Sequence, residues 1–281
     1  MKERYINPFT DFGFKKIFGE EANKDLLMDF LNELIKERGK IVELNFLNTE
    51  QLGVAVADRK AVFDLYCVNE KGERFIVELQ KAKQRYFKDR SLYYTTFAIQ
   101  EQAVKNEWDF QLQGIYTVAI MDFIFDDLPQ NKAKLRHNIQ LMDTDNHTIF
   151  YDKLNFIYLE MPKFTKKLEE LETHYDKWLY LLKNLYRLER KPLNFKEAIF
   201  KKLFEVAEIA NYDEKERYAY HSSLKYYRDL KNVIDTAVEE AVKITKDNTK
   251  SEIAKALKDE GVDWEVIMKT TQLTKEEIEK L

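Results

Sequence analysis

The stretch that decides the fold spans residues 60–80 and reads KAVFDLYCVNEKGERFIVELQ. Two runs rich in β-branched and aromatic residues, 60–69 and 73–80, flank the turn sequence NEKG at residues 69–72. A glycine at the end of such a turn suits the left-handed conformation of a three-residue hairpin loop. The pattern therefore predicts a β-hairpin.

The turn geometry also predicts which residues of the hairpin face each other. Asn69 pairs with Glu73, and counting back from that pair places Asp64 opposite Glu78 on one face of the sheet. Because side chains alternate along a strand, Gln80 shares the face of Glu78. The opposite face is apolar and comprises Phe63, Leu65, Cys67, Val77 and Leu79.

Directly opposed carboxylates need an offsetting charge. Their Cβ atoms lie about 5 Å apart, and at an effective dielectric of 20 the two charges repel by roughly 3 kcal/mol. A divalent cation bound by Asp64, Glu78 and the Leu79 backbone carbonyl would offset this, and oxygen ligands select Mg²⁺ or Mn²⁺. The alternative is that Asp64 is a solvated or hydrogen-bonded strand residue and that Glu78 pairs with a lysine. A register slip of one residue would also separate the two side chains.

A basic segment, residues 81–90 (KAKQRYFKDR), follows the hairpin directly. One interpretation is a solvated helix face, and the other is a surface that binds the phosphates of DNA. The position next to the paired carboxylates favours the second interpretation. Its cationic residues are Lys81, Lys83, Arg85, Lys88 and Arg90.

The regions around the hairpin predict alternating helices and strands. Helical spacing of apolar residues spans 14–37, where Gly19 and Asn23 can break the helix in two, and strand patterns follow at 41–48 and in the hairpin. A helix at 84–106 and a buried strand at 112–122 come next, with weaker strand signals at 137–143 and 154–160. The order α-β-β-β-α-β predicts an α/β or α+β fold with a mixed sheet.

After Pro162 the sequence shows only helical patterns. Residues 213–249 form one long polar helix or two joined helices. The tail from residue 251 turns at Gly261, and Thr274 with Glu277 forms a capping box for the last helix. The pattern of this tail is similar to that of a helix-turn-helix. Its last helix is acidic, however, which favours packing or contact within an oligomer over recognition of base edges.

Composition limits the class of protein and its compartment. Hydrophobic residues make up 44% and charged residues 34% of the 281 residues, as in a globular protein. The single cysteine, Cys67, and the four histidines argue against disulfides and a zinc cluster. The N-terminus lacks the apolar core of a signal peptide, and no apolar run reaches about 18 residues. We therefore expect a soluble cytoplasmic protein with no membrane partner.

Four stretches together resemble the PD-(D/E)XK nuclease family transposases, also called Rpn-type recombination-promoting nucleases. Asp64 followed by Glu78-Leu79-Gln80 resembles the D…(D/E)xK motif of the wider superfamily, here as D…ExQ. The other three are NPFTDFGFKKIFG at residues 7–19, DRKAVFD at 58–64 and RSLYY at 90–94. The resemblance implies a restriction-endonuclease-like αβββαβ core and Mg²⁺-dependent cleavage of DNA in recombination, often in the setting of mobile elements.

The resemblance also implies roles for individual residues. Asp64 and Glu78 would ligate the metal, and Gln80 takes the catalytic position at which the superfamily has lysine. Glutamine is neutral and can only donate or accept hydrogen bonds. Lys60, on the face of Asp64, is therefore a candidate for the missing catalytic charge, although it also suits a surface strand.

Two further residues of the matching stretches have expected roles. Arg90, on the helix after the hairpin, is a candidate phosphate contact. Asp11 directly precedes the first helix, where we expect it to cap the N-terminus rather than to act in catalysis.

These features predict a core at residues 1–162, a helical extension at 163–250 and a small helical tail at 251–281. The leading hypothesis is a Mg²⁺-dependent DNA endonuclease of low sequence specificity. A homodimer suits it, because two cuts in a duplex usually need two active sites. The alternatives are a DNA-binding or regulatory protein that keeps the fold without the chemistry, and an interaction protein that uses the long helix.

Overall fold

The computed structural model describes residues 3–51, 61–103, 109–125 and 134–281. A mixed six-stranded sheet forms its centre, with the strand order β1-β4-β5-β6-β8-β7. Strands β5, β6 and β8 run parallel to one another, whereas β1–β4, β4–β5 and β7–β8 pair antiparallel. The strands are β1 (Leu44–Phe46), β2 (Glu50–Gln51), β3 (Ala61–Val62), β4 (Leu65–Asn69), β5 (Arg74–Gln80), β6 (Ile115–Met121), β7 (Arg136–Met142) and β8 (Ile149–Glu160), of which β2 and β3 form a separate pair.

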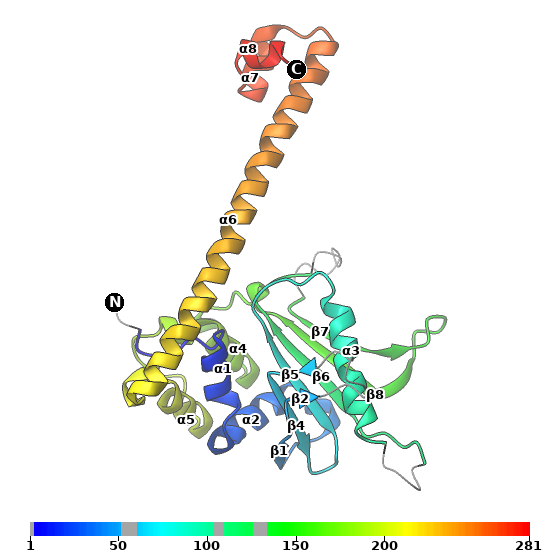
Figure 1. Cartoon of the computed structure of the whole chain (residues 1–281), viewed down its shortest axis with the longest axis vertical. Helices are drawn as coiled ribbons and strands as arrows, with labels where there is room; N and C mark the ends of the chain where they lie inside the picture. Colours follow the sequence, from blue (N-terminus) through cyan, green and yellow to red (C-terminus); the bar gives the residue numbers. More distant parts are fainter. Residues whose placement is uncertain (1–2, 52–60, 104–108, 126–133) are drawn as a thin grey trace. The chain divides into compact units, whose positions relative to one another are not determined.

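Helices cover both faces of this sheet (Figure 1). Helix α3 packs on one face, and helices α1, α2, α4 and α5 pack on the other. The helices are α1 (Asp11–Phe18), α2 (Lys24–Leu34), α3 (Phe87–Gln100), α4 (His174–Asn184), α5 (Ala198–Ala207), α6 (Glu214–Asp259), α7 (Trp264–Thr271) and α8 (Lys275–Glu279). The α/β class, the αβββαβ order and the helical C-terminal region are confirmed.

The hairpin forms with the predicted register. Asn69 donates its N–H to the Glu73 carbonyl at 3.0 Å, and Gly72 has a φ of +77°. The ladder then pairs Tyr66 with Ile76 and ends at Leu65 and Val77. The register confirms the turn geometry that was read from residues 69–72.

The two faces of the hairpin enter two cores. Leu65, Val77 and Leu79 belong to the large core under α1, α2, α4 and α5. Tyr66 and Ile76 belong to the core under α3. Phe63 also packs in the α3 core, so its predicted place beside Leu65 is wrong, because the chain bends at Asp64 and alternation is lost there.

The first helices show why this part of the chain folds as it does. The chain breaks between α1 and α2 at Gly19 and a short 3₁₀ turn, Glu21–Asn23, as the sequence predicts. The N-cap of α1 is Thr10, whose Oγ1 accepts the Gly13 N–H at 2.9 Å. The prediction that Asp11 caps this helix is wrong, because Asp11 is already its first residue.

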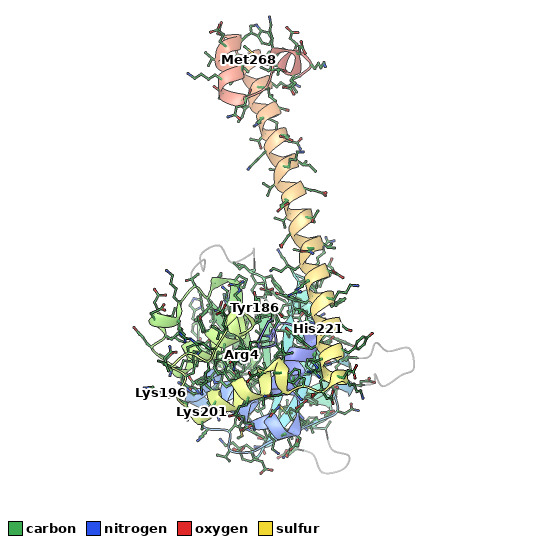
Figure 2. The ribbon with its side chains drawn as sticks, turned by 90° about the vertical axis from the view of Figure 1, so that its left-hand side faces the viewer. Arg4, Tyr186, Lys196, Lys201, His221 and Met268 are labelled. Atoms are coloured by element: carbon green, nitrogen blue, oxygen red, sulfur yellow. The ribbon has the colours of Figure 1, made fainter. Side chains whose placement is uncertain are left out.

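The chain divides into two compact units, residues 1–227 and 228–281. The second unit ends in a small core of Ala254, Ile267 and Ile278, against which Met268 packs (Figure 2). The capping box of Thr274 and Glu277 is confirmed at the start of α8. Among the described helices, none combines the length and the apolar character that crossing a membrane requires.

Candidate active site

Asp64 lies in a bend where the ladder between β4 and β5 stops. Its carboxylate Oδ2 accepts the backbone N–H of Leu79 at 2.7 Å. Its own N–H donates to Oε1 of Glu78 at 3.3 Å. The two carboxylates are therefore brought together by backbone groups, one residue beyond the regular strand pairing.

The bend changes the bonding of Leu79. In an unbroken ladder, Phe63 would pair with Leu79. The Phe63 N–H instead donates to the Thr49 carbonyl at 2.9 Å, and the Asp64 side chain takes the Leu79 N–H. Since the N–H and C=O of one strand residue point to the same side, the Leu79 carbonyl faces the position beside Asp64.

Glu78 begins a chain of side-chain hydrogen bonds on the α3 side of the sheet. Its Oε2 accepts from the Gln80 amide nitrogen at 3.1 Å. The Gln80 Oε1 in turn accepts from Nη2 of Arg90 at 2.7 Å. Glu78 is 6% exposed and Gln80 is 5% exposed, so both ends of the Gln80 amide are used inside the protein.

Two aromatic rings of α3 flank the Arg90 guanidinium. Its central carbon lies 5.7 Å from the ring centre of Phe87 and 5.5 Å from that of Tyr94. Such contacts favour the planar guanidinium and restrict its movement. The structure therefore places a fixed positive charge two hydrogen bonds away from Glu78.

Burial dominates the electrostatics of the two carboxylates. Burial, with the Asp64 charge adding to it, raises the pKa of Glu78 to about 8, although Arg90 opposes the rise. Burial also raises the pKa of Asp64, where the Leu79 N–H opposes the rise and Asp11 adds to it. Among the described residues, the nearby positive charges do not offset the effect of burial on the pKa of either carboxyl group.

The donor set fits a divalent cation. Neither Asp64 nor Glu78 forms an ion pair with a lysine or arginine in the part of the chain that the structure describes. Together with the Leu79 carbonyl they offer the oxygen donors that Mg²⁺ and Mn²⁺ prefer. The described residues hold no cluster of three or more His, Cys, Asp or Glu side chains for a metal ion, so water would complete the coordination.

The cations of the basic segment lie in different surroundings. Lys83, Arg85 and Lys88 are exposed, the first two before α3 and the third in its first turn. Lys81 is partly buried near the charges of Asp11 and Asp64, and its Nζ lies 5.8 Å from the ring centre of Tyr226. Arg90 enters the site itself, as described above. Lys60 lies outside the described residues.

A cavity of about 540 Å³ lies beside Asp64 and brings α1 and α6 to the site. Asp11 and Lys15 of α1 and Ser223 of α6 line it. The charge of Lys15 reaches Asp64, whose pKa it lowers. The sequence reasoning assigned no role to Lys15, although it lies in the stretch at residues 7–19 that carried the family resemblance.

Comparison with known protein families identifies the family of the chain. The model of the family described as "PD-(D/E)XK nuclease family transposase" matches residues 8–237 of the chain. These residues include α1, the hairpin and α3. No curated protein and no solved structure matches the chain. Because the match covers most of the sequence and all three residues of the D…ExQ pattern, the chain belongs to the PD-(D/E)XK nuclease family transposases.

Proposed function

We propose that the protein is a metal-dependent DNA endonuclease that hydrolyses phosphodiester bonds with low sequence specificity. The observation that carries the proposal is a pair of neighbouring carboxylates, the partly buried Asp64 and the buried Glu78, whose Oε1 accepts the Asp64 N–H at 3.3 Å. A fold keeps such a pair without a basic partner where a bound cation offsets the repulsion.

The residues that would hold Mg²⁺ or Mn²⁺ are Asp64, Glu78 and Leu79, the last through its backbone carbonyl. A cation bound there supplies the charge that acidifies water and offsets negative charge on a phosphate. The Leu79 N–H keeps the Asp64 carboxylate oriented toward that position, and the Gln80 amide does the same for Glu78.

Gln80 acts through its neighbours in this proposal. Its amide nitrogen donates to Glu78 and its oxygen accepts from Arg90, so these two bonds fix the orientation of the neutral amide. We therefore assign it a positioning role, and assign Arg90 the positive charge that contacts a phosphate from the α3 side.

The exposed cations Lys83, Arg85 and Lys88 would track the DNA backbone next to this site. Contacts of this kind hold the duplex without reading its bases, which is the reason for expecting low sequence specificity.

The test is cleavage of supercoiled plasmid by the purified protein in Mg²⁺ or Mn²⁺. Wild type should nick the plasmid, and EDTA or Asp64→Asn should abolish nicking. Asp152→Asn is a matched control, because Asp152 is an exposed aspartate that pairs with Arg38. Equal cutting by wild type and Asp64→Asn would refute the assignment.

The second candidate is a DNA-binding protein that retains the fold and lacks catalysis. The engagement of Gln80 at both ends of its amide favours it, since the superfamily's lysine has no free replacement at that position. This candidate requires DNA binding that is indifferent to divalent metal and no cleavage in any metal.

A further inference from the structure

The two neighbouring lysines of α1 have different surroundings. Lys16 is held by Glu20 at 2.9 Å and Glu216 at 2.6 Å, and its side chain is only 17% exposed. Lys15 lines the cavity beside Asp64, and its side chain is 53% exposed. Lys16 therefore fastens α1 to α6, whereas Lys15 retains the freedom to contact a molecule in the cavity.

The backbone packing of α1 fixes where Lys15 lies relative to Asp64. Gly19 ends the helix directly on Leu65, since a Cβ there would lie 2.9 Å from Cδ2 of Leu65. On the other side, the Phe12 N–H donates to Oγ of Ser223 at 3.1 Å. Both contacts involve backbone groups of α1, so the helix is held against the bend that carries Asp64.

The partner of Lys15 is easily exchanged. Lys15 Nζ lies 3.4 Å from a carboxylate oxygen of Asp11, one helical turn away, and both side chains are more than half exposed. Ion pairs of this kind contribute little stability. A phosphate that enters the cavity could therefore take the place of Asp11 without disturbing the fold.

Few of the described cations approach Asp64 from the side of the cavity. Arg90 approaches through Gln80 from the α3 side. On the cavity side the nearby described cations are Lys15, Lys16 and Lys81. Lys16 is held by Glu20 and Glu216, and Lys81 is partly buried near the ring of Tyr226. Lys15 is thus the described cation that combines a position beside Asp64 with an exposed side chain.

We propose that Lys15 binds the phosphate of the DNA strand that is cut, in place of the lysine that the wider superfamily carries at the position of Gln80. The inference rests on the proposed function for its substrate. In the free protein Asp11 holds the ammonium group beside the cavity, and on binding DNA the ammonium group moves to a phosphate oxygen.

The experiment compares Lys15→Gln, Lys15→Arg and Lys24→Gln with wild type. Lys24 is a matched control, because it is a lysine in a local ion pair near the surface, with Glu21 of the preceding 3₁₀ turn. DNA affinity is measured in EDTA at a series of salt concentrations, and single-turnover cleavage is measured in Mg²⁺. Thermal unfolding of each variant verifies that it is folded.

For Lys15→Gln, the slope of log affinity against log salt should fall by about one phosphate contact. The cleavage rate should fall about 100-fold, as when one charge-stabilising donor is removed. Lys15→Arg should keep the wild-type slope and most of the rate, and Lys24→Gln should match wild type in both.

An unchanged salt slope for Lys15→Gln overturns the proposal, whatever happens to the cleavage rate. Failure of the nuclease function has a different signature, because wild type would then cut no better than Asp64→Asn. The binding measurement in EDTA needs no cleavage, so it still decides whether Lys15 contacts a phosphate.

Discussion

The Asp64 carboxylate accepts the backbone N–H of Leu79 at 2.7 Å, and so replaces the ladder bond that Phe63 would otherwise make. Where the side chain takes the place of a backbone group, β4 stops and Phe63 turns toward α3. By strand geometry the Leu79 carbonyl points to the same side as its N–H, toward Asp64. The candidate metal ligands are therefore part of the hydrogen bonding that ends the hairpin.

The first prediction separates the structural role of Asp64 from its role in metal binding. Asp64→Asn keeps an oxygen that accepts the Leu79 N–H, whereas Asp64→Ala leaves that N–H without a partner in a residue that is 7% exposed. Asp64→Ala should therefore be less stable than Asp64→Asn by about 1–3 kcal/mol. Urea unfolding in EDTA measures the difference, and equal stability of the two variants would contradict it.

The second prediction concerns pH and the metal-free protein. Burial, with the charge of Asp64, raises the pKa of Glu78 from 4.5 to about 8. The folded state thus binds more protons than the unfolded state between these values, so this group lowers stability as pH rises from about 4.5 to about 8. In EDTA, wild type should lose stability relative to Glu78→Gln between pH 6 and pH 8.

Urea titrations at the two pH values check this, with Mg²⁺ as the second condition. A bound cation favours the ionised carboxylates, so Mg²⁺ should stabilise wild type more than Glu78→Gln at pH 8. A stability difference that does not change with pH would show that Glu78 titrates normally.

The third prediction distinguishes two arginines of the basic segment. Arg90 is bonded to Gln80 and lies between Phe87 and Tyr94, whereas Arg85 is exposed before α3. Lysine lacks the planar fork that these contacts require. Arg90→Lys should lower kcat by about tenfold, and Arg85→Lys should leave kcat unchanged. Equal kcat values for the two variants would remove Arg90 from the site.

The parts of the site that the sequence predicts are those that depend on local geometry. The turn at residues 69–72 determines the register, and the register brings Glu78 opposite the end of β4. The bend at Asp64 could not be predicted in this way. The bend depends on the hydrogen bond that the Phe63 N–H donates to the Thr49 carbonyl, which lies outside the hairpin.

The same reasoning explains why Lys15 was not predicted as a site residue. Its neighbour Lys16 has the same charge and lies in the same stretch of sequence, so no local pattern distinguishes the two lysines. Only the packing of α1 on Leu65 and α6 decides which lysine is held by Glu216 and which remains exposed beside Asp64. Contacts between segments so far apart in the sequence leave no local pattern.

The fourth prediction reverses a common rule for helices. Replacing glycine by alanine inside a helix usually stabilises it by up to about 1 kcal/mol. At Gly13, however, a Cβ would lie 2.2 Å from the Asn7 carbonyl oxygen, which is a backbone atom that cannot rotate away. Gly13→Ala should therefore destabilise the protein by about 1–3 kcal/mol. Thermal unfolding tests this, and a gain in stability would refute the packing of α1 described above.

The last prediction concerns a buried acid two strands away from Gln80 in the sheet. Glu160, at the end of β8, is fully buried and accepts the Phe125 N–H at 2.5 Å, and it contacts Lys163 and His137. Burial by itself would raise the pKa of Glu160, but these three partners outweigh it and lower the pKa below 4.5.

A lowered pKa in the folded state makes the contribution of Glu160 complete above pH 4.5, and it is lost as pH falls through the folded value. Glu160→Gln leaves Lys163 without its buried partner, so at pH 7 it should cost about 3 kcal/mol. Urea unfolding at pH 7 and pH 3.5 should show this deficit shrinking at the lower pH, where wild type begins to bind the proton that the variant cannot.

Lys166 and Asp176, a pair more open to solvent, provide the comparison, since Lys166→Gln should cost less than about 1 kcal/mol at pH 7. A deficit for Glu160→Gln as small as that of Lys166→Gln would mean that the buried cluster does not hold the end of β8.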